Sequence, residues 1–372
     1  MRILYITDAL AVRGGIERVL HDKMNYLVEH YCCDVHVVTT DQGEHPISYS
    51  LDERIHVHDL GILFYHQYRY KGLKRLFKYL KSERLFRKRL HACLQDVKPD
   101  LIDCIRVEFV RAIVDVKGAV PLICESHSIC RAPYYEIASI LYRIRLHLSS
   151  FRKLNKVDIM VALTQGDAND WKKYCKKVCV IPNVVHLNDT GRYGSLESKI
   201  ALFVGRFSGQ KDFGTLIEIW KIVHQRYPEW ELHAYGEGTL RPYFEKLVKE
   251  LDINIKIYTP IHNIFEKYLE GTMLLMTSRY EPFGLVLPEA MSCGLPVIAF
   301  DCPYGPADII NDGINGFLIK GRDISVYADH VCQLIESGSL RLKLGAAAKL
   351  SVNKYVDNRI MPKWKSLFDS LV

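Results

Sequence analysis

The sequence predicts an α/β fold with two doubly wound parallel sheets, one in each half of the chain. The chain has 372 residues, more than twice the usual size of one domain. Short apolar runs alternate with helical stretches, as in parallel sheets joined by crossover helices. A polar, turn-rich stretch at 184–199 divides the chain near its middle. We expect a first domain over 1–185, a linker over 186–198, a second domain over 199–352, and a last helix over 353–372 that crosses back to the first domain.

Ten apolar runs predict the strands. Those of the first half are 3–7, 35–39, 101–104, 122–126 and 158–163; those of the second are 200–204, 231–235, 255–258, 273–277 and 296–299. Ligands of open parallel sheets bind at the carboxyl ends of the strands. Residues that directly follow these runs are therefore candidates for a site, and two domains facing each other would bury a ligand in the cleft between them.

Composition excludes several classes of protein. Hydrophobic residues make up 48% of the chain and charged residues 25%, which excludes a disordered or collagen-like chain. No apolar run reaches the ~18 residues of a membrane-spanning helix, and the start MRILYITDAL fits a buried first strand better than a signal peptide, so we expect a cytoplasmic protein. The eleven cysteines include no CxxC pair, so we expect reduced thiols and no metal.

Positive charge is concentrated in residues 71–89, which hold nine Lys and Arg but only one acidic residue, Glu83. Apolar residues recur there at 73, 76, 77 and 80, the spacing of an amphipathic helix. Such a helix can lie on an anionic membrane, or its stripe can pack on the core as in any surface helix. The candidates for a membrane surface are Lys74, Arg75, Lys78, Arg87 and Lys88. Nucleic acid is the weakest interpretation, because no nucleic-acid-binding module accompanies the charges.

Three loops after predicted strands carry candidate binding residues. Gly14 and Gly15 follow the first strand, and paired glycines before a helix let backbone N–H groups approach an anion, with a tight turn as the alternative. Arg206 and Lys211 share one loop, and two such cations can neutralise a diphosphate unless the loop is merely solvated. Gly236 follows the next strand, where a turn is again the alternative.

The stretch 277–296 is the most informative. Glu281 and Glu289 lie eight positions apart in an apolar setting, and Phe283, Gly284 and Leu285 open a predicted helix between them. If the whole interval were helical, the two carboxylates would be about 12 Å apart, the length of a nucleotide-sugar. One glutamate could then hold sugar hydroxyls and the other ribose hydroxyls, with the helix start facing the phosphates. The alternative is a solvated pair or a cap.

These motifs, together with the run GINGFLI at 313–319, resemble the retaining glycosyltransferases of family four over nearly the whole chain. The resemblance implies the GT-B architecture, in which two Rossmann-like domains face each other across a cleft. The stretches 220–238 and 302–310 look like those of bacterial members that build capsule, O-antigen or lipid-linked oligosaccharides. Two positions depart from the family pattern: Thr259 stands where relatives commonly carry glycine, and Asp212 where many have glycine or asparagine.

The resemblance also implies roles for particular residues. Arg206 and Lys211 would bind the donor diphosphate with Gly236 and the backbone of Gly15, and Glu289 would bind the ribose. Glu281 and His127, which follows the strand predicted at 122–126, would act on the transferred sugar. The remaining assignments are Phe283, Gly284 and Leu285 to the donor and Gly14 and Glu17 to the acceptor side.

The implied reaction moves a hexose or N-acetylhexosamine from a nucleotide-sugar to a growing, lipid-linked cell-surface glycan. UDP is the preferred nucleotide, and no cofactor or metal is expected. The protein would work on the inner face of the cytoplasmic membrane. Two rivals stay open: a nucleotide-sugar 2-epimerase of the same fold, and a non-catalytic partner that binds a nucleotide-sugar.

Overall fold

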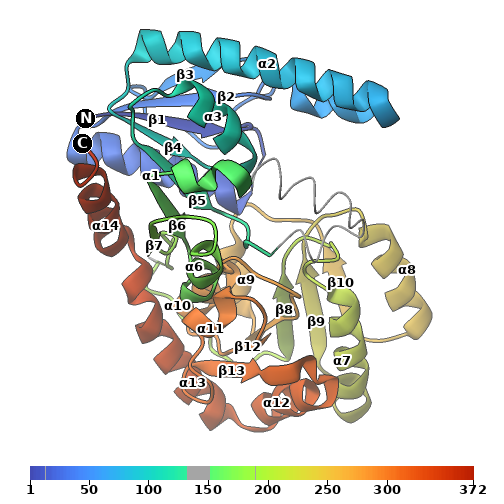
Figure 1. Cartoon of the computed structure of the whole chain (residues 1–372). Helices are drawn as coiled ribbons and strands as arrows, with labels where there is room; N and C mark the ends of the chain where they lie inside the picture. The colour runs from blue at the N-terminus through green and yellow to red at the C-terminus, as the bar shows by residue number, and fades with distance from the viewer. Residues whose placement is uncertain (13, 132–150, 189) are drawn as a thin grey trace. The chain divides into compact units, whose positions relative to one another are not determined.

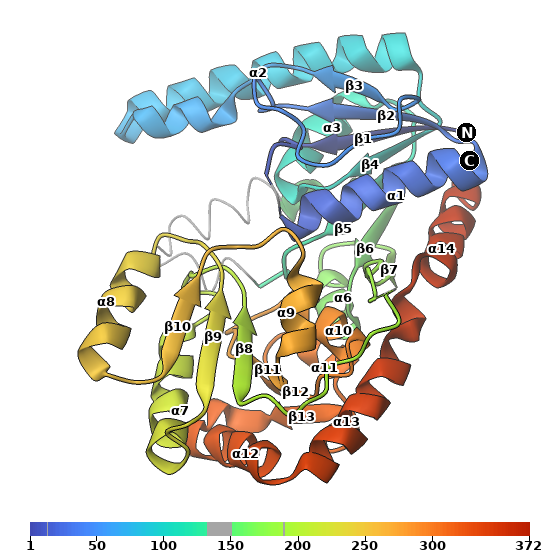
Figure 2. The same ribbon diagram turned by 180° about the vertical axis from the view of Figure 1, so that it is seen from behind.

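The chain folds into two compact units, each built on a parallel sheet (Figures 1 and 2). The computed structural model describes residues 1–12, 14–131, 151–188 and 190–372. Unit 1 comprises Met1–Val184 and Asp357–Val372, and unit 2 comprises Val185–Val356. Helices cover both faces of each sheet, so the predicted class of two doubly wound parallel α/β sheets is confirmed.

In the described part of unit 1, the sheet has seven parallel strands in the order β3-β2-β1-β4-β5-β6-β7. They are β1 (Arg2–Thr7), β2 (Asp34–Thr39), β3 (His56–Asp59), β4 (Leu101–Cys104), β5 (Leu122–Ser126), β6 (Ile159–Ala162) and β7 (Val178–Val180). The central strand β1 reads Arg-Ile-Leu-Tyr-Ile-Thr, and its apolar side chains are buried on both faces, as in a parallel sheet covered by helices.

The two faces of this sheet bury separate clusters of side chains. Leu4 and Ile6 of β1 face α2 (Gly72–Val97), α3 (Val110–Val116) and α6 (Gln165–Trp171). Ile3 and Tyr5 face α1 (Gly15–Tyr31) and α14 (Asp357–Asp369), whose Trp364 and Phe368 are buried there. The last helix of the chain therefore completes the core of unit 1.

In the described part of unit 2, the sheet has six parallel strands in the order β10-β9-β8-β11-β12-β13. They are β8 (Ile200–Val204), β9 (Glu231–Tyr235), β10 (Ile255–Tyr258), β11 (Met273–Met276), β12 (Val297–Phe300) and β13 (Gly316–Ile319). The helices are α7 (Phe213–Arg226), α8 (Arg241–Leu251), α9 (Ile264–Glu270), α10 (Val286–Ser292), α11 (Gly305–Ile309), α12 (Ile324–Glu336) and α13 (Gly338–Ser351). Trp220 and Tyr327 are fully buried in the core between α7, α12 and the sheet.

Each of the ten predicted strands overlaps an observed one, and the described residues form three further strands, each at an edge of its sheet. These are β3, β7 and β13, which have three or four residues each. The segment predicted as a linker is packed onto unit 2: Asn188 N donates to Ser292 Oγ at 3.0 Å, and the side chain of Leu196 is buried. No described helix combines the length and apolar character that a membrane crossing requires.

Candidate active site

The carboxyl ends of β8 and β11 form the switch point of the unit 2 sheet. These strands are neighbours, but the chain runs outward from β8 to β9 and β10 before it returns to β11. Ligands of such sheets bind where the strand order reverses. The loop after β8 carries Arg206 and Lys211, and the loop after β11 carries Ser278 and Glu281. The fold thus brings two predicted segments to the same edge of one sheet.

Lys211 and Glu281 form an ion pair at this switch point. Lys211 Nζ lies 2.5 Å from Glu281 Oε2, and Ser278 Oγ lies 3.2 Å from the same oxygen. Glu281 is 6% exposed, and a buried carboxylate requires such partners. The cation predicted to bind phosphate and the carboxylate predicted to bind sugar therefore meet, and an anion that approaches Lys211 competes with Glu281.

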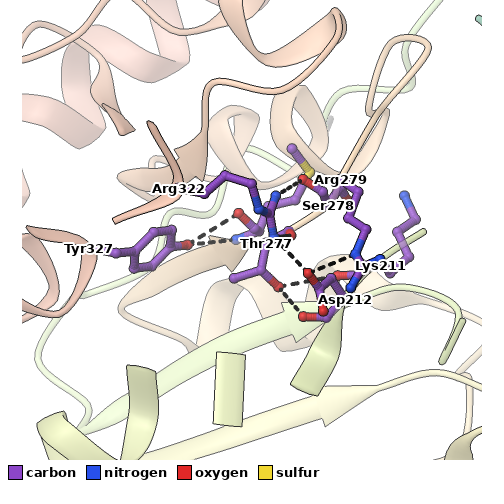
Figure 3. A network of polar contacts seen from close by, with 8 residues as sticks. Lys211, Asp212, Thr277, Ser278, Arg279, Arg322 and Tyr327 are labelled. Atoms are coloured by element: carbon purple, nitrogen blue, oxygen red, sulfur yellow. Dashed lines mark hydrogen bonds and ion pairs between the residues drawn. The ribbon is translucent and has the colours of Figure 1, made fainter. Parts of the chain in front are cut away.

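A polar network holds the loop that carries Lys211 (Figure 3). Asp212 Oδ2 lies 2.7 Å from Arg322 Nη2 and 3.1 Å from Arg279 Nε. Thr277 Oγ1 donates to the carbonyl oxygens of Lys211 and Asp212, at 3.2 and 3.0 Å. The loop is thereby fixed to the end of β11, and so is the position of the Lys211 backbone.

Arg206 and Gly236 differ in what they offer. Arg206 is exposed and has no ion-pair partner within the described part of the chain, so its guanidinium is available to a ligand. A Cβ on Gly236 would lie 1.9 Å from the carbonyl oxygen of Gly205. Close packing of the two loops thus requires glycine at 236, and this requirement exists without any ligand.

The interval between Glu281 and Glu289 is not a continuous helix. Helix α10 begins at Val286, whereas Glu281 N donates to Pro303 O at 2.6 Å and Glu281 O accepts from Gly305 N at 2.8 Å. The helical estimate of about 12 Å between the two carboxylates does not hold, because Glu281 belongs to a loop. Glu289 lies in the first turn of α10, buried, with Tyr268 Oη 3.3 Å from its Oε2.

The three residues predicted to open that helix have different roles. Phe283 is buried, with its ring edge-on to Tyr355 at a centroid distance of 5.2 Å, so its side chain belongs to the core. Gly284 has φ +90, and a Cβ there would lie 3.0 Å from Glu281 Cγ. Glycine at 284 therefore permits both the turn and the position of Glu281. Leu285 is half-buried at the start of α10.

In unit 1, His127 directly follows β5 and ends a buried chain of charges. His127 Nε2 lies 3.1 Å from Glu125 Oε2, and its side chain is almost completely buried. The other carboxylate oxygen of Glu125 contacts Lys23 Nζ, which also lies 3.1 Å from Asp103 Oδ2. Lys23 stands over the Trp364 ring at 3.7 Å. The sequence did not predict the roles of Lys23 and Asp103. Nothing in the residue pattern of α1 or β4 shows that these two charged side chains point into the core of unit 1.

The two carboxyl groups beside Lys23 differ in charge. Burial raises the pKa of Asp103 well above its usual value, and the Glu125 carboxylate raises it further. Burial acts on Glu125 in the same direction, but Lys23 and His127 outweigh it and hold the pKa of Glu125 at about 2. Glu125 is therefore the anion that pairs with Lys23 and holds the His127 ring.

The Gly14-Gly15 loop leads into the seventeen-residue helix α1 at the end of β1. Gly14 is the N-cap, Gly15 is exposed, and the Glu17 side chain folds back so that a Cβ on Gly14 would lie 2.3 Å from its Oε2. Nearby, Arg106 binds Asp8 through two contacts of 2.5 and 3.1 Å. Asp8 follows the end of β1 and Arg106 follows the end of β4. The rule that ligands bind at strand ends could therefore have identified this pair from the sequence.

The basic residues of α2 are not equivalent. Lys74 and Lys88 are exposed, whereas Arg75 is half-buried over the Tyr68 ring at 4.5 Å and Lys78 is half-buried. Arg87 lies 2.7 Å from Glu83 and 3.2 Å from Asp115. Arg87 therefore ties α2 to α3, and its charge is neutralised within unit 1.

Comparison with known proteins supplies the class. The family model described as "Glycosyltransferase Family 4" matches residues 13–189, and that described as "Glycosyl transferases group 1" matches residues 192–351. The chain belongs to the family 4 type of glycosyltransferases, with the GT-B fold. It is therefore a transferase enzyme, as the resemblance implied.

Particular relatives agree with this class. The chain is 28% identical to the amylovoran biosynthesis glycosyltransferase AmsD of Erwinia amylovora, over 99% of both chains. It is 30% identical to a poly(ribitol-phosphate) alpha-N-acetylglucosaminyltransferase of Staphylococcus aureus, over 58% of this chain and 45% of that one. Among solved structures, TarM superposes with a TM-score of 0.81 at 17% identity, covering 99% of this chain and 98% of that one. Anabaena HepE, solved with UDP and glucose, gives 0.74 at 18% identity, covering 100% and 99%.

Proposed function

We propose that this enzyme transfers a hexose or N-acetylhexosamine from a UDP-sugar to a growing cell-surface glycan, with retention of the anomeric configuration. The observation that carries the proposal is the Lys211–Glu281 pair at the switch point of unit 2. Relatives support the substrate class: two solved neighbours, TarM and HepE, were determined with UDP, and the curated relatives make amylovoran, decorate poly(ribitol-phosphate) or act on lipopolysaccharide. Retention comes from the family four resemblance.

The chemistry requires cations at the leaving group. Breaking the bond from the anomeric carbon to UDP leaves positive charge on the sugar ring and negative charge on the diphosphate. Arg206 and Lys211 would neutralise the diphosphate, so no metal is needed for this task. When the diphosphate binds Lys211, the Glu281 carboxylate loses its cationic partner, keeps its contact with Ser278 and can bind sugar hydroxyls. Glu289 would hold the ribose.

Unit 1 would supply His127 to the sugar. The Glu125 carboxylate lies within hydrogen-bonding distance of the imidazole and fixes the orientation of the ring. Lys23 in turn holds Glu125. Gly14, Gly15 and Glu17 would contact the acceptor or the donor phosphate, because they lie at the start of α1, where the helix dipole favours an anion.

The transfer assay separates this proposal from its rivals. UDP-sugars are supplied with membranes from a strain that lacks the gene, and sugar incorporated into glycan is counted. Glu281→Ala should abolish incorporation, because the sugar loses its carboxylate partner, and circular dichroism of this variant should show a folded protein. Unchanged incorporation by this variant would refute the assignment. Conversion of a UDP-sugar to its 2-epimer without acceptor would favour the epimerase. Binding of a UDP-sugar without any turnover would favour the non-catalytic partner.

The outer face of α2 supports a second proposal, peripheral binding to an anionic membrane that carries a lipid-linked acceptor. Leu73 and Phe77 are 73% and 70% exposed, and Leu80 continues the same stripe. The spacing places Lys81, Arg84 and Lys88 on that side also, opposite the buried Phe86, Leu90 and Leu94. Figures 1 and 2 show the N-terminal half of α2 extending past the strands of unit 1. Exposed apolar and basic residues together suit an interfacial helix.

Vesicle sedimentation tests the membrane proposal. Replacing Lys81, Arg84 and Lys88 by Gln should release the protein from phosphatidylglycerol vesicles. The matched control replaces Lys172, Lys176 and Lys177, which are also exposed in unit 1, and should leave sedimentation unchanged. Equal loss in both triple variants would show a non-specific effect of net charge and contradict a dedicated surface.

A further inference from the structure

Four side chains of metal-binding type lie on one face of the neighbouring strands β2 and β3. Asp34 and His36 are two residues apart on β2, and His56 and His58 are two residues apart on β3, so each pair projects to one side of the sheet. His36 and His56 are partners in the parallel register. The group lies at the amino ends of the strands, whereas His127 follows the carboxyl end of β5, so it is separate from the candidate active site.

The distances within this group are close to those of a metal site. One ligand atom each from Asp34, His36 and His56 can be chosen so that all three lie within 4.8 Å of one another. His36 Nε2 is already 3.0 Å from Asp34 Oδ1, and the ring centroids of His36 and His56 are 4.7 Å apart. Two tetrahedral ligands of Zn²⁺ are about 3.4 Å apart, given metal–ligand distances near 2.05 Å. Side-chain rotations that move the ligand atoms by about an ångström would therefore bring them to the spacing of a tetrahedral metal site.

Neighbouring residues hydrogen-bond to these side chains and orient them, as residues around the ligands of known metal sites do. His36 Nδ1 lies 2.9 Å from His58 Nε2. When His36 carries its proton on Nδ1 and donates it to His58, the lone pair of Nε2 points toward Asp34. Arg2 Nε lies 2.6 Å from Asp34 Oδ2, which leaves Oδ1 for a metal. Arg2 itself is held by the carbonyl oxygen of Val97 at 2.7 Å.

We propose that Asp34, His36 and His56 bind one divalent transition-metal ion, with Zn²⁺ as the first choice, and that His58 orients His36. Imidazole and carboxylate together suit Zn²⁺ and Co²⁺, whereas Mg²⁺ prefers oxygen ligands and keeps its waters. The metal would tie the edge strand β3 to β2. This site is independent of the proposed transfer reaction, which uses no residue of the group.

The test uses full-length protein without a polyhistidine tag, stripped with a chelator. Zn²⁺ is titrated in competition with a chromophoric chelator, and Co²⁺ binding is followed by its visible absorption. Wild type should take up one equivalent of Zn²⁺ and show a Co²⁺ band, with no competition from Mg²⁺. His36→Ala should abolish both signals, and His58→Ala should weaken Zn²⁺ binding by about 10- to 100-fold. The control His91→Ala changes an exposed histidine on α2 outside the group and should bind like wild type.

A second measurement requires no variant. Zn²⁺ should protect His36 and His56 of the wild-type protein from diethyl pyrocarbonate while His91 is modified at the same rate with and without the metal. Absence of a Co²⁺ band, or equal Zn²⁺ uptake by wild type and a folded His36→Ala variant, would overturn the proposal. So would modification of His36 and His56 at a rate that Zn²⁺ does not change.

Discussion

Arg322 Nη2 lies 2.7 Å from Asp212 Oδ2, and the same guanidinium donates to the carbonyl oxygens of Ser278 and Thr277 at 2.8 and 3.1 Å. Arg322 also covers the Phe300 ring at 4.5 Å. Both Asp212 and Arg322 have positive φ, 49 and 54. One side chain from the end of β13 thus joins the loop of Lys211 to the loop of Glu281. This explains the use of an acid at 212, where the family pattern favours glycine or asparagine.

The first prediction follows from this contact. Arg322→Ala should lower kcat/KM for transfer by about tenfold, because losing charge-assisted hydrogen bonds worth roughly 1.5–3 kcal/mol loosens the loop that positions Lys211. Arg279→Ala is the matched control, since Arg279 makes a single 3.1 Å contact with the same carboxylate and is 60% exposed. It should change kcat/KM by less than about twofold. Equal losses in steady-state assays would contradict a positioning role for Arg322.

The second prediction concerns Gly284. Gly284→Ala should reduce transfer far more than it reduces stability, because the added Cβ displaces Glu281. Gly294→Ala has the same backbone strain, since Gly294 has φ +80, but a Cβ there meets no atom within 4 Å. Both variants should lose about 1–2 kcal/mol in unfolding. When the two variants are compared at the same folded fraction, the transfer rate should fall only in Gly284→Ala. A similar fall in Gly294→Ala would show that backbone strain, and not displacement of Glu281, causes the loss.

The third prediction is a double-variant test of the buried pair in unit 1. Lys23→Met should destabilise the protein by about 3–5 kcal/mol, because it leaves the Glu125 anion buried without its cation. Adding Glu125→Gln should recover a large part of this loss. Urea denaturation of the two single variants and the double variant measures the coupling, and additive losses would show that the two groups do not depend on each other.

The fourth prediction is a pH dependence of stability. Burial raises the pKa of Asp167 from 3.8 to about 6, although hydrogen bonds from Cys130 N, Ser126 Oγ and Trp171 Nε1 oppose the shift. The folded protein therefore keeps a proton that the unfolded chain has lost. The stabilisation is complete below about pH 4 and disappears as pH rises through about 6, a change of roughly 2–3 kcal/mol.

Asp167→Asn removes the titrating group. Its urea midpoint should lack the decline that wild type shows between pH 4 and 6, whatever its absolute stability. Parallel curves for the two proteins would mean that Asp167 does not titrate in this range.

The sequence predicts those strands that are buried apolar runs, and it predicts the loops that follow these strands. Arg206, Lys211 and Glu281 could be proposed because each follows such a run, and strand order places them together. By contrast, β3 reads His-Val-His-Asp and is largely exposed, so no apolar run marks it. The group around His36 arises only from the register of β3 with β2. The Asp212–Arg322 contact joins residues 110 positions apart, and Lys23 resembles any solvated lysine of a helix until the packing of α1 is known.

The most direct test of the central claim is calorimetric titration of UDP into wild type and Lys211→Ala, with Lys246→Ala as control. Lys246 is an exposed lysine of unit 2 that pairs with Glu250 at 3.6 Å, away from the switch point. Lys211→Ala should bind UDP at least tenfold more weakly, while Lys246→Ala should bind it like wild type. Equal affinity of wild type and Lys211→Ala would show that the diphosphate does not bind at the Lys211–Glu281 pair.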